Sequence, residues 1–129
     1  MEIKEIIELA RSKTVFDCSY IAEFNFIINA KDGRSLHQKI YISQPILIEE
    51  LFICFIYGNG PINVESPSVS DISLQSLCLA IAGLEHKISR YAAINDCKFS
   101  LIGSKTTEND SFVEWSVIRK TIFAYDFTA

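Results

Sequence analysis

The middle of this chain carries a continuously apolar stretch, Leu51-Phe52-Ile53-Cys54-Phe55-Ile56-Tyr57. A run this short fits either a buried strand or a buried helix, and its content of Ile, Phe and Tyr favours a strand. Neighbouring residues of a strand point to opposite faces, so an unbroken apolar run requires cover on both faces. We therefore predict a central strand over Leu51–Tyr57 that is covered on both sides.

Alternating patterns before this stretch predict a hairpin. Apolar residues recur at every second position from Ala22 to Ile28, and a second alternating pattern runs from Leu36 to Ile42. Lys31-Asp32-Gly33 lies between them, and Asp-Gly supplies the positive φ angles that a tight hairpin turn needs. The next segment, Ile46–Glu50, fits either a strand or a turn of helix.

A second hairpin is predicted after the central stretch. Gly58-Asn59-Gly60-Pro61 is a strong turn signal, and Ile62 and Val64 then alternate with polar residues as in a return strand. Strand patterns also occur near the end of the chain, over residues 97–101 and 112–127.

A long helix is predicted over about residues 72–91, and a short amphipathic helix over residues 2–12. Ser68-Val69-Ser70-Asp71 supplies N-cap residues for the long helix. Its expected core stripe follows the three- and four-residue spacing of one helix face and consists of Leu74, Leu77, Cys78, Ile81, Leu84, Ile88 and Tyr91. The resulting order, α-β-β-β-β-α-β-β, predicts a single α+β domain over residues 1–129, with an antiparallel sheet of about five to six strands and the helices packed on one face.

Composition is typical of a globular domain in a reducing compartment. Of 129 residues, 49% are hydrophobic and 12% aromatic, which is enough apolar area for a core without metals or disulfides. The four cysteines form no CxxC pair and lie among apolar neighbours, so we expect buried free thiols. The charged start of the chain has no signal-peptide core, and the longest apolar run is too short to cross a bilayer. We therefore expect a cytoplasmic protein.

The sequence contains no recognisable motif for catalysis or cofactor binding, such as GxGxxG, GxxxxGK[ST], HExxH or GxSxG. His37 and His86 stand outside any motif, and adjacent Glu49 and Glu50 on a strand would point to opposite faces rather than form an acid–base pair. A basic face for nucleic acid and a basic amphipathic helix for membranes are also missing. We therefore predict that the protein is not an enzyme and has no cofactor, metal, nucleic-acid partner or membrane association.

Charge is distributed unevenly along the chain. Between Lys39 and Lys87 there is no lysine or arginine, but there are five acidic residues, Glu49, Glu50, Glu65, Asp71 and Glu85. This window therefore has a charge of −5, whereas the whole chain has −4. We expect Glu49, Glu50, Glu65 and Asp71 to form one acidic rim at an end of the sheet, with Tyr41 or Phe52 as the apolar anchor. Such a surface favours a basic protein partner.

Part of the chain resembles a family of small, mostly uncharacterised bacterial proteins. The resemblance covers residues 29–83 and rests on the Asp-Gly hairpin, the Phe52-Ile53-Cys54-Phe55-Ile56-Tyr57-Gly58 strand and the helix that opens with Asp71-Ile72-Ser73-Leu74-Gln75-Ser76-Leu77. In size and acidity the chain is also similar to immunity proteins, which neutralise the toxins of contact-dependent growth inhibition. That similarity implies a toxin inhibitor and brings no catalytic residues onto positions of this sequence.

Three functional hypotheses follow. The leading one is a cytosolic inhibitor or immunity protein that binds a basic bacterial toxin domain, such as a nuclease, through its acidic surface. The alternative is a non-catalytic structural or assembly subunit, for example a homodimer joined by sheet edges such as the apolar run Ile122–Phe127. A third class is a small-ligand binder, or an enzyme of unknown chemistry, that uses a cleft between sheet and helix.

Overall fold

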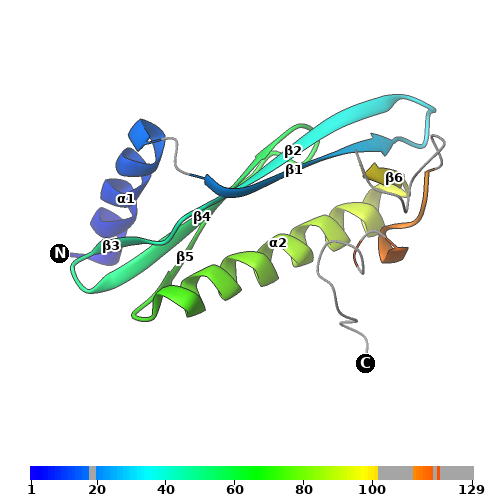
Figure 1. The fold of residues 1–129 in the computed structure, drawn as a ribbon. Helices are drawn as coiled ribbons and strands as arrows, with labels where there is room; N and C mark the ends of the chain where they lie inside the picture. Colours follow the sequence, from blue (N-terminus) through cyan, green and yellow to red (C-terminus); the bar gives the residue numbers. More distant parts are fainter. Residues whose placement is uncertain (18–19, 102–111, 118, 120–129) are drawn as a thin grey trace.

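The protein is built on an antiparallel sheet with one helix against each face (Figure 1). The computed structural model describes residues 1–17, 20–101, 112–117 and 119. Its elements are α1 (Ile3–Asp17), β1 (Tyr20–Asn29), β2 (Ser35–Ser43), β3 (Ile46–Ile48), β4 (Leu51–Asn59), β5 (Glu65–Ser70), α2 (Ser73–Asn95) and β6 (Lys98–Leu101). The α+β class and the antiparallel sheet are confirmed, with six strands among the described residues.

The predicted central strand corresponds to β4, which pairs with three other strands. β5 runs along one edge of β4, from Phe52 to Tyr57, and the other edge pairs with β3 near its start and with β2 near its end. β2 then pairs with β1, and β1 with β6. The interior of β4 is fully enclosed, since every residue from Ile53 to Ile56 is at most 1% exposed.

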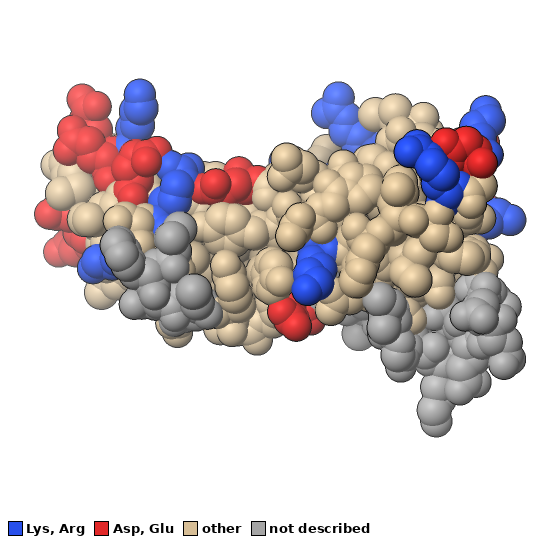
Figure 2. Space-filling view, turned by 90° about the horizontal axis from the view of Figure 1, so that it is seen from above, with Lys and Arg blue, Asp and Glu red and all other residues tan. Residues whose placement is uncertain are grey.

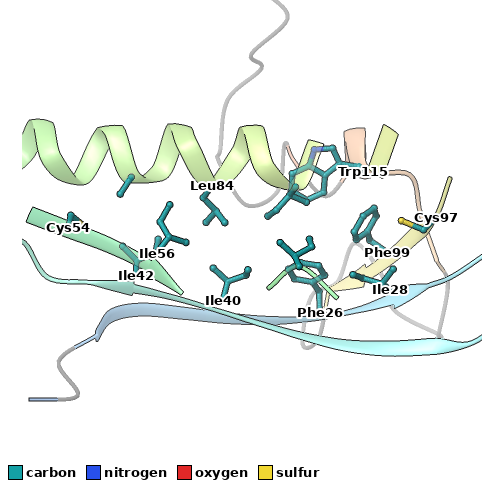
Figure 3. Packing of buried hydrophobic residues seen from close by; sticks show 13 residues of the cluster. Phe26, Ile28, Ile40, Ile42, Cys54, Ile56, Leu84, Cys97, Phe99 and Trp115 are labelled. Carbon is teal, nitrogen blue, oxygen red and sulfur yellow. The ribbon is translucent and has the colours of Figure 1, made fainter. Parts of the chain in front are cut away.

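The two helices occupy opposite faces of the sheet, which differs from the expected packing on one face. Cys54 and Ile56 of β4 belong to the larger core cluster, which includes Leu84 of α2 and residues of every strand except β3 and β5 (Figure 3). Ile53 and Phe55 point the other way and pack in a second cluster with Ile6 of α1. The physical reason is the continuous apolar pattern of β4, because it presents side chains to both faces and each face needs its own cover.

Several element boundaries differ from the sequence expectation. The return strand begins at Glu65 rather than at Ile62, because the chain first closes a loop in which Gly58 N–H donates to the Val64 carbonyl at 2.7 Å. Ser68 and Ser70 therefore belong to β5 instead of capping α2. Near the C-terminus, residues 115–117 are helical rather than extended, and the Ile122–Phe127 run lies outside the described residues.

The core stripe of α2 agrees with the predicted one at Leu77, Ile81, Leu84, Ile88 and Tyr91, and differs from it in the first turns of the helix. Leu74 is 67% exposed and Cys78 is exposed, whereas the small residues Ser76 and Ala80 are fully buried. Small side chains let a helix backbone approach a sheet closely, and an apolarity pattern gives no weight to a serine. The described cysteines are free thiols, of which Cys54 and Cys97 are buried as expected.

Neither described helix combines the length and apolarity that a membrane span requires.

The buried thiol of Cys54 makes the stability of the fold depend on pH. Cys54 is fully buried and its S–H donates to the Ser43 carbonyl at 3.1 Å. Burial raises the pKa of this thiol from about 9 to about 11. Because the folded state holds the proton more tightly than the unfolded state, the stabilisation is complete below pH 9 and is lost as the pH rises through 11.

We expect the free energy of unfolding to fall by on the order of 2 kcal/mol between pH 9 and 11 through Cys54. Urea unfolding at several pH values measures this slope. Cys54→Ala should flatten the slope in that window, whereas Cys78→Ala, at an exposed site on α2, should leave it unchanged. Identical slopes for the two variants would contradict the assignment.

Candidate interaction surface

The turn between β3 and β4 consists of two glutamates in an unfavourable backbone conformation. Ile48 pairs with Leu51, so Glu49 and Glu50 form a two-residue hairpin loop. Their φ angles are 51° and 71°, both in the left-handed region. A hairpin loop of this kind prefers Asn-Gly, and L-residues such as glutamate cost about 1–2 kcal/mol each there. The structure thereby shows that residues 46–50 form a strand and a turn, not a turn of helix.

The turn between β5 and α2, which contains Asp71, lies at the same end of the sheet as the β3–β4 turn (Figure 1). Ser70, the last residue of β5, pairs with Phe52, the second residue of β4. Asp71 follows Ser70, just as Glu50 precedes the start of β4, so the three carboxylates meet where β4 begins. All three residues are exposed, and none has an ion-pair partner among the described residues. We call Glu49, Glu50 and Asp71 the acidic end.

Glu65, which was expected in the same rim, lies elsewhere. It pairs with Tyr57, five residues along β4 from Phe52, which places it about 17 Å from the acidic end. The reason is the antiparallel register, because Glu65 opens β5 whereas Asp71 follows it. Arg11 of α1 donates a hydrogen bond to Glu65 and another to Glu8. These bonds raise the pKa of the Arg11 guanidinium, so Glu65 serves to hold α1 on the sheet.

Glu85, the remaining acid of the window, is also neutralised. Arg119 Nε lies 2.8 Å from Glu85 Oε1, and both side chains are largely buried. Ser89 donates to the same carboxylate at 2.7 Å and accepts a hydrogen bond from Trp115 Nε1 at 2.7 Å. This chain of contacts attaches Trp115 and Arg119 to α2. Two of the five acids in the lysine-free window therefore have internal partners, and the acidic end retains the other three.

Of the two expected anchors, only Phe52 is at the acidic end. It is half-buried and pairs with Leu47, whose side chain is 56% exposed. Ile72, next to Asp71, is 57% exposed. Neither Leu47 nor Ile72 was singled out from the sequence. Side chains alternate between the two faces of a strand, so in the apolar strand Ile46–Ile48 the middle residue, Leu47, points to the face opposite its two neighbours.

Tyr41 belongs to a different part of the sheet. It pairs with Tyr57 across β2 and β4, and its ring stacks on Tyr20 with 4.7 Å between centroids. Tyr41 is therefore level with Glu65 on the opposite edge of β4, and does not lie with Glu49, Glu50 and Asp71.

The start of α1 adds charged side chains to this end of the molecule. Ile6 packs in the same cluster as Ile48, which brings the exposed Glu2, Lys4 and Glu5 close to the β3–β4 hairpin. Seen from the α1 side, acidic side chains gather at this end, with basic ones among them (Figure 2). The middle of the same face is mostly uncharged.

The histidines and acidic groups form no metal centre in the described residues, where no cluster of three or more His, Cys, Asp or Glu could hold an ion. His37 is on β2, on the face that α1 covers in part, and His86 is on α2 at the opposite face. The sheet therefore separates the two histidines.

No family model, curated protein or solved structure matches this chain. The candidate site consequently rests on geometry and charge alone.

The turn residues should reduce the stability of the fold. Replacing Glu49-Glu50 by Asn-Gly removes two strained residues and the repulsion between neighbouring carboxylates. Because glycine loses more conformational entropy on folding, which offsets part of this gain, we expect a net stabilisation of about 1–3 kcal/mol in urea unfolding. The double variant Glu49→Gln with Glu50→Gln is the matched control, because it removes the charge and keeps the backbone strain. Its free energy of unfolding should rise by less than that of the Asn-Gly variant. An Asn-Gly variant no more stable than the wild type would show that the turn is unstrained.

Proposed function

We propose that this protein is a cytoplasmic inhibitor of the immunity type, which binds a basic bacterial toxin domain and covers its active site. The observation that carries the proposal is the acidic end. Glu49, Glu50 and Asp71 have no ion-pair partner among the described residues, and two of them occupy a turn that they destabilise. Backbone strain of this kind persists where function requires the residue.

Charge and apolar side chains at the acidic end would have separate roles in binding. Exposed carboxylates raise the association rate with a basic partner and exclude acidic ones. Affinity comes mainly from apolar anchors in well-packed contacts, and Leu47 and Ile72 offer exposed apolar surface beside the carboxylates. The combination suits a protein partner better than a single ion, because both kinds of contact are presented together.

A nuclease is the class of toxin that fits this surface best. Enzymes that act on nucleic acid carry basic grooves for the phosphate backbone. An acidic, rigid hairpin would complement such a groove and exclude the substrate. Two-residue hairpins are among the stiffest projections that a sheet offers, so little conformational freedom is lost on binding.

The alternative of a homodimer joined by sheet edges is favoured by one observation. Among the described residues, β6 pairs with β1 from Phe26 to Asn29, and no strand pairs with the outer edge of β1 from Ile21 to Asn25. Ile21 on this edge is 49% exposed. An unpaired edge with apolar side chains invites pairing with a second copy.

Light scattering of the purified protein distinguishes the monomeric inhibitor from the homodimer. The inhibitor proposal predicts a mass of one chain, 14.6 kDa, at micromolar concentration. A stable dimer that Ile21→Lys converts to monomers would support the edge-pairing alternative instead.

The direct test is co-expression with a candidate toxin, followed by association kinetics with the toxin domain that the protein neutralises. We expect Glu50→Lys to slow association by at least tenfold at low salt, and the difference to shrink at high salt, because ions screen exposed charges. Glu114→Lys makes the same change of charge at an exposed site outside the acidic end and should have a much smaller effect. Equal association rates for the two variants would show that the acidic end is not the docking surface.

A further inference from the structure

A groove separate from the acidic end lies between α2 and the loop that joins β4 to β5. The loop contributes Ile62 and Val64, and the C-terminal half of α2 contributes His86, Lys87, Arg90 and Ile94. The volume of the groove is about 360 Å³. His86 is fifteen residues beyond Asp71, which corresponds to roughly 20 Å along the helix. The two sites are therefore independent.

The loop wall of this groove is held in place by a buried amide. Gln38 is fully buried, and its side chain accepts a hydrogen bond from Ile62 N–H at 2.7 Å and donates one to the Ile62 carbonyl at 2.9 Å. The amide thus pairs with the loop backbone as a neighbouring strand would. Gly58 permits the same close approach, since a Cβ there would lie 2.3 Å from the Ile62 carbonyl oxygen. The wall is consequently formed before any ligand binds.

The charged residues that line the groove in the described part of the chain have one sign. Lys87 and Arg90 lie on one side of α2 with His86, and none of the described lining residues is acidic. Among the described residues, neither Lys87 nor Arg90 has a carboxylate within 4.0 Å. Two cations without counter-ions beside a concave wall raise the local concentration of anions.

Apolar side chains border these cations. Val64 is half-buried, and Ile94 is 69% exposed on the same side of α2 as Arg90. An exposed isoleucine at the rim of a preformed groove offers apolar area that a ligand would bury favourably. The groove therefore presents a cationic part and an apolar part to one ligand.

We propose that this groove binds a small anionic molecule with an apolar body. Its phosphate or carboxylate head would bind Arg90 and Lys87, because a guanidinium offers two parallel donors to such a group. Its apolar body would lie against Val64 and Ile94. A volume of about 360 Å³ is in the range of small-molecule sites, and it holds a ring with a charged substituent. This inference does not depend on the inhibitor function.

Titration of the ¹⁵N-labelled protein with phenyl phosphate, followed by NMR, tests the proposal. We expect saturable shifts of the amides of residues 62–64 and 86–95, and much weaker effects from inorganic phosphate or benzyl alcohol, which each supply half of the ligand. Benzoate is a second probe that distinguishes a carboxylate site from a phosphate site. The probe that binds more tightly identifies the head group of the ligand.

Variants complete the test. Lys87→Gln with Arg90→Gln should weaken phenyl phosphate binding at least tenfold, whereas Lys4→Gln, at an exposed site on α1, should not change it. Ile94→Glu, which places a carboxylate at the rim, should also weaken binding, and Leu74→Glu, at an exposed site elsewhere on α2, is its control. The proposal is overturned if neither anionic probe gives saturable shifts at these residues, or if the glutamine variant binds as tightly as the wild type.

Discussion

The enclosure of β4 on both faces is the constraint on which the rest of the structure depends. Its residues from Ile53 to Ile56 alternate between two core clusters, and none is more than 1% exposed. Fully burying one such side chain contributes roughly 2–3 kcal/mol, so leaving either face open to water would remove a large part of the stability of a small domain. α1 must therefore cover one face while α2 covers the other. The three pairing strands then fix both edges of β4.

This constraint also positions the acidic end. Because β3 pairs with the start of β4 and the last residue of β5 pairs with Phe52, the β3–β4 turn and the residue after β5 come to the same end of the sheet. Glu49, Glu50 and Asp71 are thus held together by main-chain pairing rather than by contacts of their own. The two other acids of the same window, Glu65 and Glu85, form ion pairs with Arg11 and Arg119. A count of charges along a sequence is therefore not a map of the surface.

The sequence predicted the elements with strong periodicity and failed where tertiary contacts override local pattern. The central strand, the first hairpin and the long helix follow from apolar spacing and the Asp-Gly turn. The Glu49-Glu50 turn could not be predicted, because glutamate is rare at left-handed positions and only the register of β3 and β4 imposes it. Most of the predicted stripe of α2 lies in the core, but Ser76 and Ala80 take the places expected for Leu74 and Cys78, since close packing on the sheet selects small side chains there. For the candidate site, the sequence grouped Glu49, Glu50, Asp71 and Phe52, which do lie at one end of the sheet. It also grouped Glu65 and Tyr41 with them, and the pairing of β4 with β5 and β2 places those two residues farther along the sheet.

Native-state hydrogen exchange of the β4 amides tests the central claim most directly. If β4 is enclosed on both faces, the amides of residues 53–56 should exchange only through global unfolding, with a free energy equal to that of urea unfolding. The amides of β1 from Ile21 to Asn25, where no described strand pairs with the outer edge, should exchange through smaller openings. Exchange of the β4 amides as fast as that of this edge would contradict a fold organised around a doubly covered strand.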